Sequence, residues 1–313
     1  MSVIRGALKG VRALHSRALG GLVARLPVLE PTFIAAGRRM AAASHLLGTL
    51  YWFAQDDLLL RLRASGNRFR PLRVAGVDVH VDVTDGSGRL HYFHGEPYEP
   101  DSAQALRDRL APGDVFVDVG ANIGYFTVLA ARIVGDQGRV VAFEPHPEAL
   151  RVLRRALDVN RVAHVVDVVE AAVAASPGTT RLFVSGDPVL STLDPKRSPA
   201  RDHFGFERSI PVQQVTGDEW FAAHPELAAR VAAIKIDVEG TEADVLAGMR
   251  HVRLACPHAL IICETEAGGP ADTQLKAEGY AAANLDIRRD TFGNYAYSKR
   301  VPSAPGPSPN GAV

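Results

Sequence analysis

The pattern of apolar and polar positions changes three times along the chain. Residues 1–66 are rich in alanine, leucine and arginine and are interrupted by two prolines, which predicts a helical arm. Over residues 72–93, short apolar runs alternate with polar residues on either side of the DGSG sequence at Asp85–Gly88, which predicts a β-hairpin. From Asp114 onward, short apolar strands alternate with helical segments. This alternation is typical of a mostly parallel sheet with helices on both faces, so we expect an α/β fold.

The individual elements of the α/β region can be placed from this alternation. Strands are expected at Val115–Val119, Arg139–Phe143, Val165–Val169, Ala232–Val238 and Ala259–Cys263, and late antiparallel strands at Tyr280–Leu285 and Tyr295–Ser298. Helices are expected at Tyr125–Val134, Glu148–Asn160 and Glu242–Met249. We therefore divide the chain into a helical arm (1–70), a β-hairpin (71–100), a main domain (101–300) and a tail (301–313). The proline, serine and glycine content of the tail predicts disorder.

Charge is balanced over the whole chain but not along it. The 313 residues include 35 lysines and arginines and 35 aspartates and glutamates, which disfavours a nucleic-acid partner. In the first fifty residues, seven basic residues face a single acid, Glu30. The nearly uncharged run Met40–Ala54 is too short to span a bilayer and predicts a core or surface helix. The alternative is an interfacial segment that contacts a membrane weakly together with the basic arm.

The two cysteines, Cys256 and Cys263, lie in apolar surroundings and predict neither a disulfide framework nor a zinc site. We therefore expect a cytoplasmic protein, either free or peripheral at the membrane.

The sequence VDVGANIGYFT at Val117–Thr127 places Gly120 and Gly124 between an apolar strand and a helix, where glycine allows a tight bend and the close approach of a ligand. Dinucleotide-binding folds use a similar GxGxxG sequence. Here the middle position is Asn122, which serves a pyrophosphate less well. Asp118 at the strand end would repel phosphates but suits the ammonium group of S-adenosyl-L-methionine. The turn therefore favours this cofactor, with a nicotinamide-dependent oxidoreductase as the enzymatic alternative.

Acidic residues follow three of the expected strands. Glu144 lies about twenty residues after the glycine turn, where an acid can accept hydrogen bonds from ribose hydroxyls. In IKIDVEGTEADVL, strand alternation puts Lys235, Asp237 and Glu239 on one face, and Glu264 ends the next strand in the same way. Three acids at neighbouring strand ends could bind a divalent metal. Because no histidine completes a cluster, we predict no metal site.

Together these motifs resemble the FkbM family of methyltransferases. The shared pattern runs from about Gly95 to Glu264 and includes Tyr98–Pro100, PGDVFVDVGANIGYFT, GRVVAFEPHP and IKIDVEGTEADVLAGM. The resemblance implies a class I, Rossmann-like methyltransferase fold that binds S-adenosyl-L-methionine and methylates a hydroxyl of a sugar, glycan or secondary metabolite. It also implies that Asp118, Gly120, Asn122, Gly124 and Glu144 bind the cofactor, and that Asp237 and Glu239 lie beside the methyl group and the acceptor. The chain departs from the family near His146, where asparagine is usual, and at Gly217 and Asp218, where the family has an LD pair.

A hydroxyl acceptor needs a general base, for which we expect Asp237 or Glu239 first, Glu264 second and His203 third. The region Ser185–Arg208 is expected to form a long loop over the substrate. A non-catalytic protein that binds the cofactor or serves as a scaffold is the alternative from a different class.

Overall fold

The computed structural model describes residues 21–185, 191–198, 205–286 and 292–299. Contacts divide the chain into two compact units, Met1–Tyr98 and Glu99–Val313. The boundary between the units follows Tyr98, close to residue 100, where the sequence analysis ended the hairpin region. The two units are described separately.

Two helices dominate the first unit, α2 (Glu30–Ala43) and α3 (His45–Ser65), after a short 3₁₀ turn, η1 (Pro27–Leu29). The helices cross closely at Gly37, where an added Cβ would lie 1.9 Å from the ring of Tyr51. Phe33 and Phe93 complete this aromatic cluster, with their ring centroids 6.4 Å apart. The unit therefore has an apolar core of its own.

The hairpin of the first unit does not turn where the sequence predicted. Strands β1 (Phe69–Val74) and β2 (Val77–Asp82) pair antiparallel around Ala75 and Gly76, whose φ angles of 48° and 90° suit a two-residue turn. Asp85–Gly88 instead begins α4 (Gly86–Arg89), because the Asp85 carboxylate caps it by accepting from the amide of Gly88. The RLHYF run, expected as a strand, continues as a π-helical turn, η2 (Leu90–His94).

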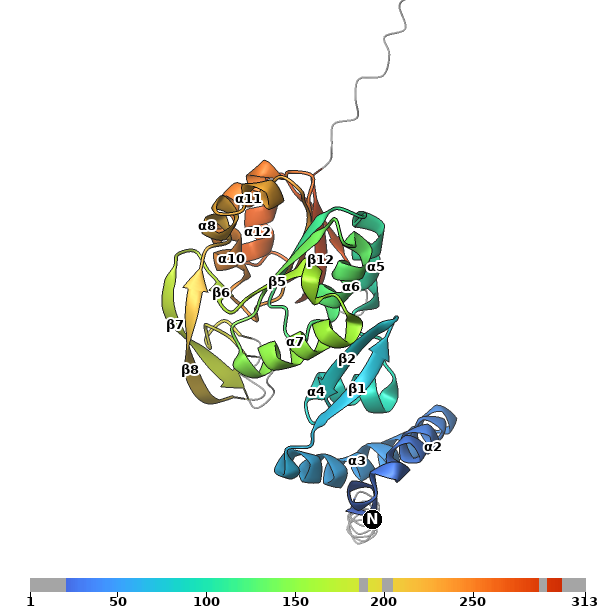
Figure 1. Cartoon of the computed structure of the whole chain (residues 1–313). Coiled ribbons are helices and arrows are strands. Elements are labelled where there is room, and N and C mark those ends of the chain that lie inside the picture. The colour runs from blue at the N-terminus through green and yellow to red at the C-terminus, as the bar shows by residue number, and fades with distance from the viewer. Residues whose placement is uncertain (1–20, 186–190, 199–204, 287–291, 300–313) are drawn as a thin grey trace, which may run out of the picture. The chain divides into compact units, whose positions relative to one another are not determined.

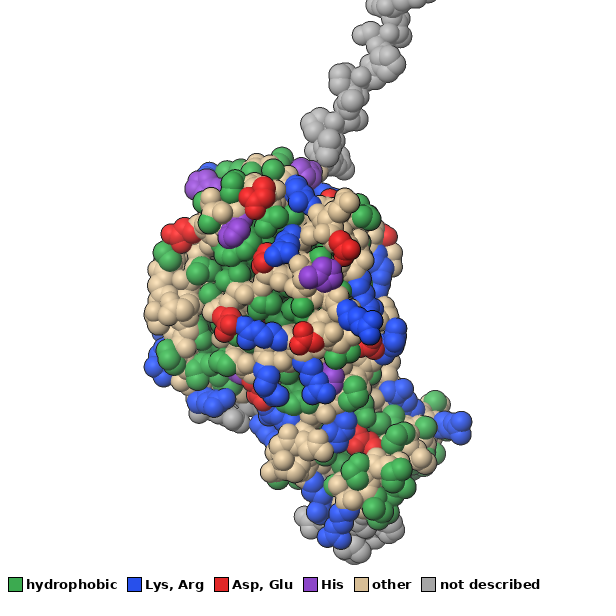
Figure 2. All heavy atoms as spheres, viewed as in Figure 1, with side chains coloured by type: hydrophobic (Ala, Val, Ile, Leu, Met, Phe, Trp, Pro, Cys, Tyr) green, Lys and Arg blue, Asp and Glu red, His purple; other side chains and the backbone are tan. Residues whose placement is uncertain are grey.

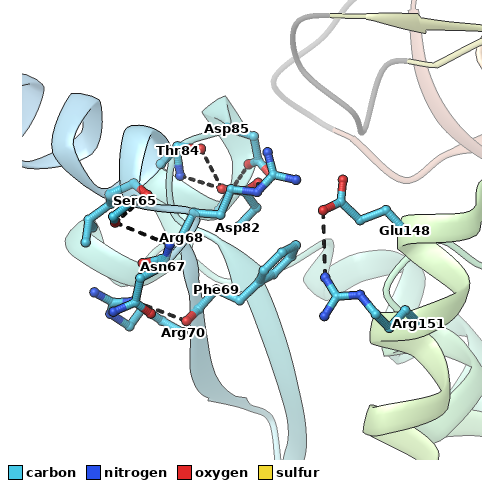
Figure 3. Close-up of polar contacts among 12 residues, drawn as sticks. Ser65, Asn67, Arg68, Phe69, Arg70, Asp82, Thr84, Asp85, Glu148 and Arg151 are labelled. Atoms are coloured by element: carbon cyan, nitrogen blue, oxygen red, sulfur yellow. Dashed lines mark hydrogen bonds and ion pairs between the residues drawn. The ribbon is translucent and has the colours of Figure 1, made fainter.

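Asp82 ends β2 and ties the hairpin to the start of β1 (Figure 3). Its Oδ1 accepts from the backbone amide and the hydroxyl of Thr84 at 2.9 and 2.6 Å, and its Oδ2 lies 3.0 Å from Nε of Arg68. These contacts tie the end of β2 to the residue before β1 and to the first residues of the segment that leads to α4.

Several large apolar side chains of the first unit are exposed: Leu22, Leu26, Val28, Leu46, Trp52, Phe53 and Leu60. Figure 2 shows apolar and basic side chains mixed on the visible face of this unit. Among the described residues, no helix is both long and apolar enough to cross a bilayer. Contact of this arm with a membrane surface stays a prediction.

A buried ion pair in the first unit provides a test of its packing. Glu30 is 4% exposed and accepts hydrogen bonds from Arg70 at 2.7 and 3.0 Å and from the hydroxyl of Tyr92 at 2.9 Å. Glu30→Ala should lower the free energy of unfolding by about 3–5 kcal/mol, because it leaves a largely buried guanidinium without its counter-charge. Asp78→Ala removes an exposed pair with Arg73 and should cost at most about 1 kcal/mol. Urea unfolding followed by fluorescence of Trp52 in a Trp220→Phe background measures both losses, and equal losses would contradict the expectation.

A seven-stranded sheet in the order β11-β12-β10-β9-β3-β4-β5 forms the centre of the second unit. Its strands are β3 (Val115–Val119), β4 (Arg139–Phe143), β5 (Val166–Val169), β9 (Val231–Ile236), β10 (Leu260–Glu266), β11 (Ala281–Asn284) and β12 (Phe292–Ser298). The first five of these are parallel, whereas β12 runs antiparallel to both β10 and β11. The predicted α/β fold with late antiparallel strands is confirmed. All five residues of β3 are buried, since a central parallel strand is covered on both faces.

Helices cover both faces of this sheet (Figure 1). The helices are α5 (Pro100–Arg109), α6 (Tyr125–Val134), α7 (Pro147–Asn160), α8 (Gly217–Ala222), α9 (Pro225–Ala228), α10 (Glu242–Gly248), α11 (Arg250–Ala255) and α12 (Pro270–Ala277), with a 3₁₀ turn, η3 (Ala163–Val165). In Figure 1, α8, α10, α11 and α12 gather on one side of the sheet and α5 and α6 on the other. The first group packs on an apolar face that includes Val117, Ile234 and Ile236. The opposite face carries the charged residues described below.

A second, three-stranded sheet lies beside the main one in the order β6-β8-β7 (Figure 1). Its strands are β6 (Ala172–Val173), β7 (Gly178–Ser185) and β8 (Phe206–Val215). The region 185–208, expected as one long loop, is entered at both ends by β7 and β8, and Thr192 bridges to Phe183 by backbone hydrogen bonds of 2.8 and 3.1 Å. His203, the third candidate base, lies outside the described residues.

Candidate active site

The glycine turn after β3 is held against the end of β9. Gly120 has a φ of 84°, and a Cβ at this position would lie 1.9 Å from the carbonyl oxygen of Asp237. Gly124 has a φ of 88°, and its Cβ would meet Leu153 of α7 at 2.4 Å. The left-handed backbone favours glycine at both positions, and at Gly120 the space also requires it, because the atom in the way belongs to the backbone. The sequence anticipated the bend but not that the backbone of Asp237 fills the space beside Gly120.

The N–H groups of this turn are already used inside the protein. The amides of Gly120 and Ala121 donate to the carbonyl of Phe143 at 3.0 and 3.1 Å, and the amide of Gly124 donates to Ala121. The amide of Asn122 donates to Glu144 at 2.8 Å. A phosphate-binding loop works by presenting such N–H groups to the ligand. The turn thus fits a cofactor without phosphate better than a dinucleotide.

Glu144 joins the ends of β3 and β4. One of its carboxylate oxygens accepts from the amide of Asn122 and the other from the amide of His146 at 2.7 Å. The residue is 6% exposed, and burial raises the pKa of its carboxyl to about 7. His146, where the family usually has asparagine, caps α7 by accepting from the amides of Glu148 and Ala149 through Nδ1. Each carboxylate oxygen of Glu144 retains a second lone pair for a ligand hydroxyl.

Strand register brings several charges onto the sheet face covered by α5 and α6. Asp118 of β3 is the direct neighbour of Lys235 of β9. The Asp118 carboxylate is 1% exposed and accepts from the hydroxyl of Thr127 on α6 at 2.6 Å, and burial raises its pKa to about 6. Asp118 therefore lies beneath the turn rather than at its surface.

Lys235 is the cation at the centre of this cluster. Its residue is 2% exposed, and its ammonium lies 2.7 Å from Oδ2 of Asp237, 3.8 Å from Oε2 of Glu99 and 4.6 Å from the ring centroid of Phe126. Burial alone would raise the pKa of Asp237, but the Lys235 ammonium outweighs it and holds that pKa below its ordinary value. Lys235 thus keeps Asp237 ionised.

The three acids expected from the strand ends do come together. Ligand oxygens of Asp237, Glu239 and Glu264 all lie within 4.8 Å of one another. Burial, followed by the charges of Asp237 and Glu239, raises the pKa of Glu264 well above its ordinary value, and a hydrogen bond joins it to Asp237. The pair can therefore share one proton, with Asp237 as the stronger acid.

Glu239 is positioned by a strained backbone and by the segment between β7 and β8. Its φ of 57° lies in the left-handed region, and its carbonyl accepts from the hydroxyl of Thr192 at 2.8 Å. A Cβ on the following residue, Gly240, would lie 2.8 Å from the carbonyl oxygen of Arg197. The described part of this segment therefore packs on the loop that carries two of the acids.

Two residues of the site were not singled out by their chemistry in the sequence. Glu99, at the start of α5, has a φ of 34° and a buried Oε2, and burial raises the pKa of its carboxyl. Its only signal was its place in the Tyr98–Pro100 motif. Thr192 lies in a family-like STL stretch of the region expected to cover the substrate, and only the fold brings it to Glu239.

Comparison with known families identifies this arrangement. A family model described as a methyltransferase FkbM domain matches residues 118–289, more than half of the chain. The chain belongs to the FkbM methyltransferase family. Its membership makes it a methyltransferase with S-adenosyl-L-methionine as its cofactor. This agrees with the glycine turn, whose N–H groups donate to protein acceptors and are not presented to a phosphate.

Several curated methyltransferases are similar in sequence to this FkbM-family protein. It is 32% identical over 161 residues to the 31-O-demethyl-FK506 methyltransferase FkbM of Streptomyces tacrolimicus, covering 45% of this chain and 61% of the relative. It is 29% identical over 195 residues to the hexuronic acid methyltransferase AglP of Haloferax volcanii, covering 61% and 74%. It is 27% identical over 187 residues to methyltransferase 1 of Beauveria bassiana, covering 55% and 74%.

Solved structures resemble this FkbM-family protein only distantly. A precorrin-6y C5,15-methyltransferase from Geobacter metallireducens matches with a TM-score of 0.38 and 16% identity, covering 64% of this chain and 87% of that one. The TYW2 protein of M. jannaschii, solved with AdoMet, matches with a TM-score of 0.40 and 12% identity, covering 74% and 84%. Likeness at this level adds nothing to the functional assignment.

Proposed function

We propose that this protein transfers a methyl group from S-adenosyl-L-methionine to a hydroxyl of a sugar, a glycan or a secondary metabolite. The observation that carries the proposal is the pairing of Asp237 and Glu264 beside Lys235. This group lies at the carboxyl ends of adjacent parallel strands, where open α/β sheets bind their ligands. The name of the FK506 methyltransferase indicates transfer to an oxygen, and a hexuronic acid offers both hydroxyl and carboxyl oxygens.

We propose that Glu144 binds the ribose of the cofactor and that the cofactor lies along the turn formed by Gly120, Asn122 and Gly124. The buried Glu144 carboxylate, held by two backbone amides, has acceptor capacity left for hydroxyls. Asp118 lies beneath the same turn, where its negative charge favours the ammonium group at the other end of the cofactor.

In this mechanism the carboxylates accept the proton of the acceptor hydroxyl. The bound cofactor supplies an electrophilic methyl carbon on a positively charged sulfur. A hydroxyl that attacks this carbon must lose its proton, and a carboxylate within hydrogen-bond reach can accept it. We assign that role to Asp237, kept ionised by Lys235, with Glu264 as the group that shares the proton and Glu239 completing the acidic wall. Lys235 acts as a positioning residue for Asp237, and Glu99, whose Oε2 lies 3.8 Å from the ammonium, acts on Lys235.

Incubation with methyl-labelled S-adenosyl-L-methionine and a panel of glycans and hydroxylated metabolites tests the proposal. Transfer of label to an oxygen of any acceptor, located by mass spectrometry, supports it. Saturable cofactor binding without transfer to any member of the panel would favour the non-catalytic alternative. A thermal-shift comparison with NAD is the first control, since only a ligand of the native state raises the unfolding temperature.

Cofactor affinity should depend on pH through Glu144. Because its pKa in the ligand-free protein is about 7, its carboxylate is present above pH 7 and is lost as the pH falls below that value. Affinity should therefore decrease about tenfold from pH 8 to pH 6, as expected for one linked proton. Glu144→Gln should bind more weakly at both pH values and lose most of this dependence.

Titration calorimetry at the two pH values measures the effect of Glu144. Glu148→Gln, on the exposed face of α7 where Glu148 pairs with Arg151 at 3.7 Å, is the matched control and should keep the full dependence (Figure 3). Because the ligand's own titration is common to all variants, an unchanged slope in Glu144→Gln would refute the placement of the ribose.

A further inference from the structure

Register across three strands places a row of oxygen donors at the edge of the acidic cluster. The β9–β10 pairing ends at Ile236 and Cys263, so the next residues, Asp237 and Glu264, lie side by side. On the other side of Glu264, Asn294 of β12 is its direct cross-strand partner. Cross-strand partners point to the same face with their Cβ atoms about 5 Å apart. The Asn294 side chain is therefore directed to the same place as the two carboxylates.

The carboxamide of Asn294 carries an unmet hydrogen-bonding requirement. Asn294 is 9% exposed, and its Oδ1 is buried with no hydrogen-bond donor among the described residues. A buried polar oxygen without a partner costs about 1–3 kcal/mol, so such atoms in a native protein call for an explanation. A ligand that accepts electron pairs from oxygen would satisfy it.

The spacing of the carboxylate oxygens and the charge of the cluster both suit a metal cation as this ligand. Opposite ligands are about 4.2 Å apart around Mg²⁺ and about 5 Å apart around Ca²⁺. Oxygens that all lie within 4.8 Å of one another match the wider spacing and reach the narrower one by a small shift of the side chains. Three carboxylates beside one ammonium give the cluster an excess of negative charge, which a divalent cation would neutralise in place of the proton shared by Asp237 and Glu264. Lys235 donates to Oδ2 of Asp237 at 2.7 Å, and the ion would lie between Asp237 and Glu264, where the two carboxyl groups now share a hydrogen bond. The side chain of Asp237 is 23% exposed, which gives a hydrated ion access.

We propose that Asp237, Glu239, Glu264 and Asn294 form a binding site for a divalent, oxygen-preferring cation of the Mg²⁺, Mn²⁺ and Ca²⁺ class. The sequence predicted no metal because no histidine accompanies the acids, but an all-oxygen set needs none for cations of this class. The fourth donor, Asn294, is thirty residues beyond Glu264 and reaches it only through the antiparallel pairing of β12. Together with the proposed function, on which this role rests, the ion would hold the acceptor oxygen and favour loss of its proton to a carboxylate.

Binding of Mn²⁺ to the full chain without added acceptor tests the site directly. Loss of the free-ion signal in electron paramagnetic resonance should give about one ion per chain with saturable affinity. Glu264→Gln and Asn294→Ala should each weaken binding tenfold or more, while Asn294→Asp should bind at least as tightly as the natural chain. Glu266→Gln, at the exposed end of the same strand, is the matched control and should leave binding unchanged.

Two results would overturn the site. One is no saturable Mn²⁺ binding by the natural chain, shown to be folded by a cooperative thermal transition. The other is equal binding by the natural chain, Glu264→Gln and Asn294→Ala, which would place any ion elsewhere. Methyl transfer without added cation and in the presence of EDTA would overturn its catalytic role while leaving the proposed function intact. Mn²⁺ binding with no transfer to any hydroxyl would instead contradict the proposed function alone.

Discussion

Asp237→Asn is expected to lower the rate of methyl transfer about 10²–10⁴-fold, the usual contribution of a positioned general base. Asparagine preserves the volume of the side chain but cannot accept the proton. It also leaves Lys235 without its nearest carboxylate, 2.7 Å away in the natural protein. Cofactor affinity should change little, because the turn contacts the backbone of Asp237 rather than its carboxylate. Single-turnover rates and titration calorimetry measure the two quantities separately.

The control for this substitution is Asp244→Asn on α10. Asp244 lies on the helix that follows the same loop and pairs at the surface with Arg197, so its loss should leave the rate within about twofold of the natural enzyme. If Asp237→Asn retained full activity, the carboxylate would not be the base. If rate and cofactor affinity fell together, Asp237 would belong to the cofactor site.

Gly120→Ala should destabilise the second unit by roughly 2–6 kcal/mol. The left-handed backbone at this position costs a side chain about 1–3 kcal/mol. The added methyl group would also lie 1.9 Å from a carbonyl oxygen, and relieving such an overlap costs about another 1–3 kcal/mol. The overlap involves backbone atoms, which cannot rotate away, so the ends of β3 and β9 would have to separate.

Gly113→Ala isolates the two parts of this cost. Gly113 has a φ of 91°, close to that of Gly120, but a Cβ there meets nothing within 4 Å, so only the backbone cost applies. Urea unfolding followed by Trp220 fluorescence in a Trp52→Phe background reports on the second unit alone. Equal losses for the two alanine variants would show that the end of β9 does not press against the turn.

Sequence and structure give independent reasons why the glycine turn suits S-adenosyl-L-methionine better than a dinucleotide. In the sequence, Asn122 in place of a glycine and Asp118 at the strand end argued against a pyrophosphate. The structure adds a separate reason, since the amides of Gly120, Ala121 and Asn122 donate to Phe143 and Glu144 and are not presented to a ligand.

Local pattern was sufficient for the seven strands of the central sheet and for α6, α7 and α10, but the three-stranded sheet and α5, α8, α9, α11 and α12 were not predicted. The bounds expected for β3, β4 and α6 agree with those observed, because strand and helix periodicities are properties of consecutive residues. Local pattern was insufficient at Asp85–Gly88. Turn residues there are also good helix caps, and the competing turn at Ala75 and Gly76 has a shape that sequence alone does not reveal.

By itself, the sequence determined the alternation of strands and helices, the glycine turn, and the acids at three strand ends. Only the tertiary structure decided which of these residues meet. It placed the carbonyl of Asp237 against Gly120, buried Asp118 beneath the turn, and set Asn294 beside Glu264. The physical reason is that the periodicity of apolar residues depends on neighbours in the sequence, whereas strand order and register depend on contacts between residues far apart in the chain.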